Sequence, residues 1–248
     1  MNLQLDTVLY ISAAMAVGGF VKGATGAGLP QVAIPVMASF LGVETAVVIM
    51  AIPGIITNTW LLWNFRSHFK QTRDLPALLA TGIVGAILGT SLLHSLDEKA
   101  LSFFVAGMIG LYTILFFAHP DLRLSARVTR YTSPPVGFTS GLLQGATGMS
   151  GPVIATYLHA YRLQKEVFVV SITTVFQVYA VAQAATLLGV GLYNTERAVL
   201  SVLSLIPIMI MLPLGARVAK QLSRRTFDLI VLVLLLASAT KLVIEAVG

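Results

Sequence analysis

Two short glycine-rich segments carry the residue pattern in this sequence that is best suited to binding chemistry. Gly23-Ala24-Thr25-Gly26 recurs as Gly145-Ala146-Thr147-Gly148, and Pro30 and Pro152 follow the two segments at the same distance. Glycine lets a backbone approach a ligand closely, and proline suits the first turn of a helix because it has no N–H to leave unpaired. The free N–H groups and the positive dipole end of such a helix attract anions. The segments therefore predict two anion-binding helix N-termini.

The predicted site includes the polar residues that border these segments. Thr25, Thr147 and Ser150 would add hydroxyl donors, and Gln144 would add an amide. Lys22 stands where the second segment has the neutral Gln144. A buried cation there would balance a bound anion, whereas an ammonium group that extends to the aqueous surface would have no such role. The residues of the predicted site are Lys22, Gly23, Ala24, Thr25, Gly26, Ala27, Gly28 and Pro30 in the first half, and Gln144, Gly145, Ala146, Thr147, Gly148, Met149, Ser150, Gly151 and Pro152 in the second.

The composition indicates that a membrane surrounds these segments. Of the 248 residues, 56% are hydrophobic and only 10% are charged, and the mean hydropathy is +0.87. A soluble protein carries roughly 25% charged residues, so most of this surface must face lipid. The net charge of +6 does not indicate a nucleic-acid partner, because the basic residues are scattered between apolar stretches. With no cysteine, the chain has no disulfide or thiolate metal site, and its first residues lack the basic region of a signal peptide.

The elements that must position the segments are membrane-spanning helices and two interrupted apolar regions. Two regions, 7–41 and 131–161, are cut by glycine and proline. Each predicts a first piece of about 12–16 residues, a break, and a second piece of about 12 residues that reaches only about 18 Å, short of the ~30 Å membrane core. Both are therefore interpreted as re-entrant helical hairpins. The predicted spanning helices are residues 45–65, 75–96, 100–118, 167–189, 198–216 and 226–247.

The two halves of the chain repeat the same order of elements. Each half reads as a broken hairpin followed by three spanning helices. The predicted first repeat covers residues 1–118, a cytoplasmic linker covers 119–133, and the second repeat covers 134–248. The residue pairs that support this are Gly23 and Gly145, Pro30 and Pro152, and Glu44 and Glu166 at an offset of 122, and Gly89 and Gly215, and Leu96 and Leu222 at an offset of 126.

The basic residues set the predicted orientation of the repeats. Twelve of the 16 lie in four connections, at 64–74, 119–133, 162–166 and 217–226. By the positive-inside rule these connections are cytoplasmic. Three crossings after each hairpin then make the repeats inverted and place both termini outside the cytoplasm, in a multi-pass protein of the cytoplasmic (inner) membrane. The same count results if both arms of each hairpin cross fully, and only the short second arms favour re-entrant hairpins.

Polar residues inside the spanning helices are further candidates for the site. Asn58, Gln177, Tyr179 and Gln183 lie mid-span, and Tyr179 and Gln183 share one helical face. They are predicted to line a cavity, although such residues can instead hydrogen-bond to a neighbouring helix. The glycines have a similar alternative, because small residues let helices pack closely in membranes.

Motifs of enzymes are absent from the sequence. It contains no HExxH, GxSxG or P-loop pattern, and its carboxylates lie mostly at span ends. We therefore predict no catalytic residues, no metal site and no cofactor. Membrane lipid is the expected environment, and a homo-oligomer is left open.

The chain resembles the TauE/SafE family of sulfite exporters. The resemblance rests on the segments Gly23–Pro30 and Gly145–Pro152, each at the head of a four-element apolar half, and on Leu214-Gly215-Ala216-Arg217 before a basic connection. It implies transport of sulfite, thiosulfate or an organosulfonate such as sulfoacetate. It also implies coupling to an ion gradient, for which we expect protons. Because paired broken helices in inverted repeats are typical of secondary transporters, we expect a secondary transporter that works by alternating access. The unequal loops, with Ser150 opposite Gly28, predict unequal contributions of the two halves.

Three other interpretations remain open from the residues alone. The first is a transporter of the same architecture for a small anion without sulfur, such as a carboxylate, or for a cation. The second is an anion channel, and the third is a membrane scaffold that transports nothing. The sequence leaves the direction of transport, the coupling ion and the oligomeric state undetermined.

Overall fold

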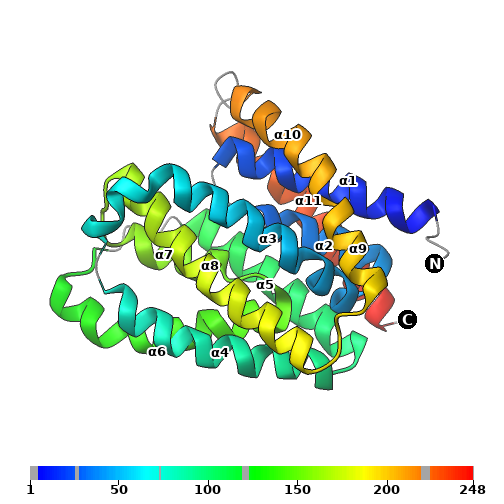
Figure 1. The fold of residues 1–248 in the computed structure, drawn as a ribbon, viewed down its shortest axis with the longest axis horizontal. Coiled ribbons are helices and arrows are strands. Elements are labelled where there is room, and N and C mark those ends of the chain that lie inside the picture. Colours follow the sequence, from blue (N-terminus) through cyan, green and yellow to red (C-terminus); the bar gives the residue numbers. More distant parts are fainter. Residues whose placement is uncertain (1–4, 26–27, 73, 119–122, 219–223, 248) are drawn as a thin grey trace.

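A computed structural model describes residues 5–25, 28–72, 74–118, 123–218 and 224–247, which form helices and no strand (Figure 1). The helices are α1 (Leu5–Thr25), α2 (Leu29–Leu41), α3 (Val43–Phe65), η1 (Arg66–Gln71), α4 (Leu75–Ser95), α5 (Glu98–Ala118), α6 (Ala126–Thr147), α7 (Gly151–His159), α8 (Lys165–Gly189), α9 (Thr195–Leu203), α10 (Leu205–Val218) and α11 (Arg224–Val247).

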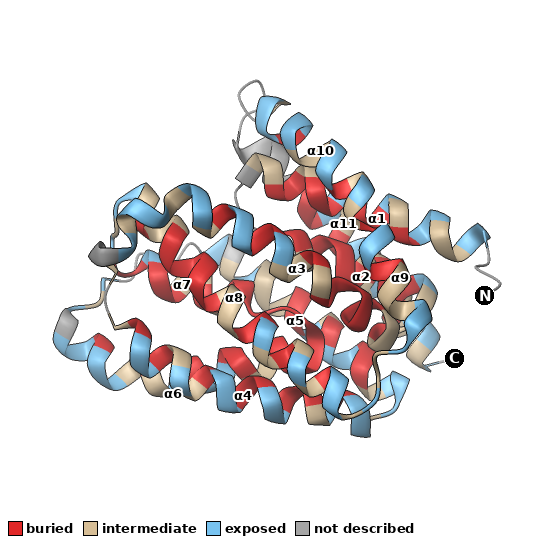
Figure 2. Ribbon diagram, viewed as in Figure 1, coloured by how far each residue is buried: buried red, intermediate tan, exposed pale blue. Residues whose placement is uncertain are grey.

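Six segments among the described residues are long and apolar enough to cross a membrane. They are Leu5–Ala24, Val43–Phe69, Leu75–Ser95, Glu98–Leu115, Lys165–Gly189 and Thr195–Val218. Five match predicted spans, and α11 covers the sixth predicted span, 226–247. Buried residues gather where the helices meet, and exposed residues lie on their outward sides (Figure 2). The predicted fold class, an all-helical membrane protein with several spans, is confirmed.

The predicted length of the first piece of each hairpin is wrong. Helix α1 has 21 residues and α6 has 22, so each extends about 32 Å rather than half the membrane. Gly18 and Gly19 do not end α1, because the bodies of α2 and α10 pack directly against them. Helix α6 begins earlier than expected, since the Ser125 side chain caps it by accepting from the Val128 N–H. Packing and capping thus override the low helix propensity of glycine and proline.

The second pieces are short, as predicted. Helix α2 has 13 residues and α7 has 9, or about 20 and 14 Å. Both begin deep in the molecule and run back beside the preceding long helix. In Figure 1 the ends of α3 and α7 lie at the left, opposite the marked N and C ends of the chain at the right.

Close contacts between helices repeat at the offsets found in the sequence. A Cβ atom on Gly89 would lie 2.1 Å from the carbonyl oxygen of Leu142, and one on Gly215 would lie 2.0 Å from that of Phe20. The two glycines are 126 positions apart and their two partners are 122 positions apart. The contact of Gly89 with Leu142 and that of Gly215 with Phe20 are therefore related by the two offsets of the sequence repeat.

A second pair of contacts follows the same rule. A Cβ on Gly145 would lie 2.2 Å from the Ala86 oxygen, and one on Gly23 would lie 1.9 Å from the Leu212 oxygen. Helix α6 thus packs against α4 in the way that α1 packs against α10. Because each pair joins the first half to the second, the halves interlock around α3 and α8, which pack together.

Candidate functional site

A cavity of about 40 Å³ lies where the first turns of α2 and α7 meet α3 and α8. The ends of α1 and α6 complete its wall. The residues of the predicted site that line it are Lys22, Gly28, Pro30, Gln144, Gly148, Ser150 and Gly151, together with Asn58 and Gln183 from the predicted mid-span set. The structure therefore brings both glycine-rich segments to one cavity.

The cavity lies between corresponding residues of the two halves. Ala51 on α3 and Thr173 on α8 both line it and are 122 positions apart. The other corresponding pairs on the wall are Lys22 and Gln144, Gly28 and Ser150, Gly54 and Phe176, and Asn58 and Ala180. A space between equivalent positions can stay in place while the two halves exchange conformations.

Lys22 contributes a basic side chain to this wall. Its residue is only 5% exposed, and its Nζ donates to Thr57 Oγ1 at 2.9 Å and to Asn58 Oδ1 at 2.8 Å. Both partners are neutral. Among the residues that the structure describes, no acidic residue lines the cavity and no carboxylate pairs with Lys22. The side chain therefore stays inside the protein instead of extending to the surface.

In the second half, Gln144 corresponds to Lys22. There a network of neutral amide side chains forms the wall. Gln144 Nε2 donates to Gln183 Oε1 at 3.2 Å, and Gln144 Oε1 accepts from Ser150 Oγ at 2.8 Å. Gln183 Nε2 in turn donates to the backbone oxygens of Gln144 and Gly145 at 2.8 and 3.2 Å. This network ties the end of α6 to the start of α7 and to α8.

The two half-helices begin at the cavity without side-chain caps. Gly28, the N-cap of α2, has φ 92°, and Gly148, which ends α6, has φ 69°. Left-handed backbone at both positions favours glycine. Neither Gly28 nor Ser150, the N-cap of α7, caps its helix with a side chain, so the first-turn N–H groups lack such a partner. The helices start at Leu29 and Gly151, one residue before the two prolines.

Comparison with known families decides what kind of protein carries this site. The model of the sulfite exporter TauE/SafE family matches residues 10–242. The chain belongs to the TauE/SafE family. No curated protein and no solved structure gave a significant match. Together with the apolar helices, membership makes the chain an integral multi-pass membrane protein of a transporter family named for sulfite export.

Other residues of the predicted site have structural roles in this TauE/SafE protein. Gly23 and Gly145 lie against helix backbones and do not line the cavity. The hydroxyl of Thr147 donates to the Leu143 oxygen at 2.7 Å, so it is occupied within α6. Ala24, Ala146, Met149 and Pro152 also lie off the cavity wall. Gly26, Ala27 and the side chain of Thr25 lie outside the described residues.

Two mid-span residues that we predicted to line a cavity lie elsewhere. Tyr179 is fully buried, and its hydroxyl donates to the oxygens of Leu78 and Gly137 at 3.1 and 3.3 Å, joining α8 to α4 and α6. Gln177 Nε2 donates to Thr59 Oγ1 on α3 at 3.1 Å. Both residues hydrogen-bond to neighbouring helices, which was the alternative to lining the cavity.

Several residues of the wall were not predicted from the sequence. The most polar are Gln31 and Thr173. Gln31 follows Pro30 directly, so its place in the first turn of a half-helix was a usable signal. No such signal marked Thr173. Helix α8 contains several threonines, and the sequence does not tell which of them faces the cavity. The remaining residues of this group are Val47, Met50, Ala51, Gly54, Phe176 and Ala180.

Proposed function

We propose that this TauE/SafE protein is a secondary transporter that carries a small sulfur-containing anion through the central cavity by alternating access. The observation that supports this best is Lys22, a buried cation whose side-chain partners among the described residues, Thr57 and Asn58, are neutral. An isolated buried charge is costly, and such a charge inside a membrane protein typically marks a substrate path. A bound anion would supply the missing counter-charge. The two uncapped helix starts would add N–H donors and positive dipole ends.

The size of the cavity supports a compact anion. Its volume of about 40 Å³ is far below the roughly 300–1,000 Å³ of pockets for drug-sized ligands. Sulfite or thiosulfate fits this limit better than an organosulfonate with a carbon chain. Substrate-contacting groups in this proposal are Lys22, Asn58 and the first turns of α2 and α7.

Alternating access is supported by the repeated packing. We infer that the halves are repeats because the same two offsets relate sequence matches and helix contacts. The basic connections support an inverted arrangement in the cytoplasmic (inner) membrane with both termini outside. Inverted repeats with paired half-helices rock around a central site in other secondary transporters. We propose the proton gradient as the driving force.

Transport by purified protein in liposomes tests the proposal. We expect the wild type to accumulate labelled sulfite or thiosulfate with saturation, and to lose accumulation when a protonophore removes the pH gradient. Lys22→Gln, which installs the residue found at position 144, should lower the rate at least about 100-fold, as expected for loss of a buried charged contact. Lys165→Gln, at the exposed start of α8, is the control and should transport normally.

The outcomes separate the alternatives. Flux that does not saturate and single-channel currents would indicate a channel. Failure to transport either anion under any pH gradient would refute the substrate assignment, and full activity of Lys22→Gln would refute the role of the lysine.

A further inference from the structure

Hydrogen-bond donors on the cavity wall are largely occupied by the protein itself. Both N–H groups of the Gln183 amide donate to backbone oxygens, and the Ser150 hydroxyl donates to Gln144. Within the described part of the chain, the side chains of Gln31 and Thr173 line the cavity and make no hydrogen bond. Unpaired polar groups in a protein interior require an explanation. These two neutral groups therefore have donors to offer a ligand.

The carboxamide of Gln31 lies directly on the start of α7. A Cβ atom built on Gly151 would be 1.2 Å from Gln31 Nε2 and 2.5 Å from its Cδ. Any side chain at position 151 would thus occupy the space of this amide. Because Gln31 belongs to the first turn of α2, its amide sits between the two half-helix starts. Its counterpart in the second half is the apolar Val153, so only one amide occupies this place.

Thr173 differs from its neighbours on α8 in the use of its hydroxyl. The hydroxyls of Ser171 and Thr174 donate to the oxygens four residues earlier, each at 2.7 Å. Thr173 makes no such bond, although its residue is only 2% exposed and lies on the cavity wall. Its counterpart in the first half is Ala51, which has no donor. Thr173 is therefore a buried residue on the cavity wall with an unpaired hydroxyl that the other half lacks.

We propose that Gln31 and Thr173 are the specificity-determining residues of the site, which donate to separate oxygens of the bound anion and thereby select an oxyanion over a halide. The inference rests on the proposed function. Lys22 attracts any anion by charge. Fixed neutral donors, in contrast, stabilise only a bound ligand that presents several acceptor atoms. A site built around such hydrogen bonds rejects ligands that cannot make them, because its buried donors are then left unpaired.

Competitive binding to the purified full-length protein tests this inference. Affinities for sulfite and chloride are measured for the wild type, Thr173→Val, Gln31→Leu and Thr174→Val. Valine at 173 keeps the shape of threonine and removes the hydroxyl. Thr174→Val is the matched control, since that hydroxyl bonds within α8 and lies off the cavity wall. Thr173→Ser keeps the hydroxyl and should bind like the wild type. It therefore separates loss of the hydroxyl from a change in packing.

We expect each of Thr173→Val and Gln31→Leu to lower the ratio of sulfite to chloride affinity about 10- to 100-fold, as for loss of a hydrogen bond to a charged group. Thr174→Val and Thr173→Ser should keep the wild-type ratio. An unchanged ratio in both Thr173→Val and Gln31→Leu, with wild-type sulfite binding intact, would overturn the inference and leave the proposed function standing. A wild type that binds no sulfite would instead contradict the proposed function.

Discussion

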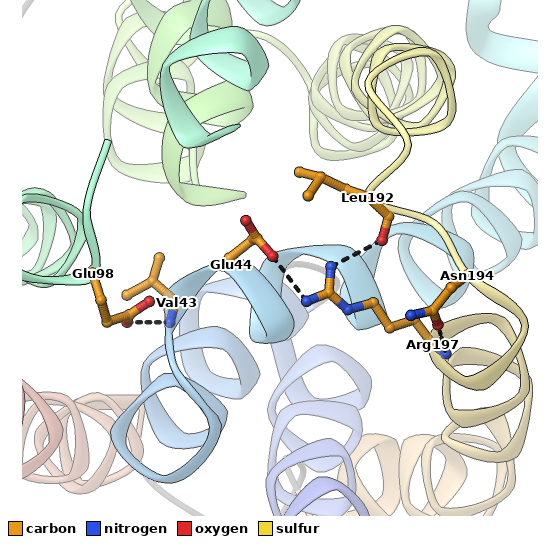
Figure 3. A network of polar contacts seen from close by, with 6 residues as sticks. All are labelled: Val43, Glu44, Glu98, Leu192, Asn194 and Arg197. Carbon is orange, nitrogen blue, oxygen red and sulfur yellow. Dashed lines mark hydrogen bonds and ion pairs between the residues drawn. The ribbon is translucent and has the colours of Figure 1, made fainter. Parts of the chain in front are cut away.

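Arg197 of α9 and Glu44 of α3 form an ion pair between the two halves, with Nη2 of the arginine 2.8 Å from Oε1 of the glutamate (Figure 3). Nη1 of the same guanidinium donates to the Leu192 oxygen at 2.9 Å. Nearby, Glu98 Oε1 accepts from the Val43 N–H at 2.5 Å, at the start of α3. These contacts fix the start of α3 against both neighbouring helices. The ion pair therefore joins the first half of the chain to the second.

Breaking this ion pair should cost stability in a way that depends on both partners. The two side chains are 22% and 29% exposed, so we expect a coupling energy of about 1 kcal/mol, near the upper end for partly exposed pairs. A double-mutant cycle of Glu44→Gln and Arg197→Gln, followed by thermal unfolding in detergent, measures it. Additive effects of the two substitutions would show that the pair does not couple the halves.

Alanine at the interlocked glycines should destabilise the fold. Gly145→Ala and Gly23→Ala place a methyl group about 2 Å from a backbone oxygen of the partner helix, and such overpacking typically costs about 1–3 kcal/mol. Gly107→Ala and Gly110→Ala in α5 are matched controls, because nothing lies within 4 Å of either new methyl. They should be neutral or stabilising by up to ~1 kcal/mol. Equal effects at all four positions would contradict the packing role.

Tyr179→Phe should lower stability and leave anion binding unchanged. The hydroxyl joins α8 to α4 and α6 but lies off the cavity wall, and its loss should cost about 1–2 kcal/mol. Thermal unfolding and sulfite affinity are measured on the same preparation. Tyr131→Phe, at a residue that is 74% exposed, should change neither. A loss of sulfite affinity without a loss of stability would indicate that Tyr179 contributes to the binding site.

The orientation of the chain can be read from single cysteines, since the sequence has none of its own. Glu196→Cys lies at the exposed start of α9, and Arg127→Cys at the exposed start of α6. A membrane-impermeant maleimide should label the first in intact cells and the second only after permeabilisation, because basic connections stay in the cytoplasm. The reverse pattern would invert the proposed topology.

Much of the fold could be predicted because its signals are local. A run of about 20 apolar residues is sufficient to predict a spanning helix, and the short half-helices α2 and α7 followed from the glycine and proline around Pro30 and Pro152. The lengths of α1 and α6 were not predictable in this way. Gly18 and Gly19 look like a break in the sequence, yet close packing against α2 and α10 keeps α1 continuous.

The candidate site was predicted in part for the same reason. The glycine-rich segments reach the cavity, with Lys22, Gly28 and Gly148 on its wall. Their individual roles were not separable, because glycines at a ligand and glycines at a helix contact look alike in sequence. Gly148 lies at a left-handed turn beside the cavity, while Gly145, three residues earlier, lies against α4.

The sequence by itself determined the membrane-spanning character, the repeat and the resemblance to the TauE/SafE family, since composition, apolar length and motif order do not depend on how helices pack. Only the tertiary structure decided which polar groups are occupied and which are available. Lys22 could have reached the surface, and Thr173 resembled Thr174. Their burial and hydrogen-bond partners depend on the rotation of each helix against helices distant in the sequence, which no local pattern encodes.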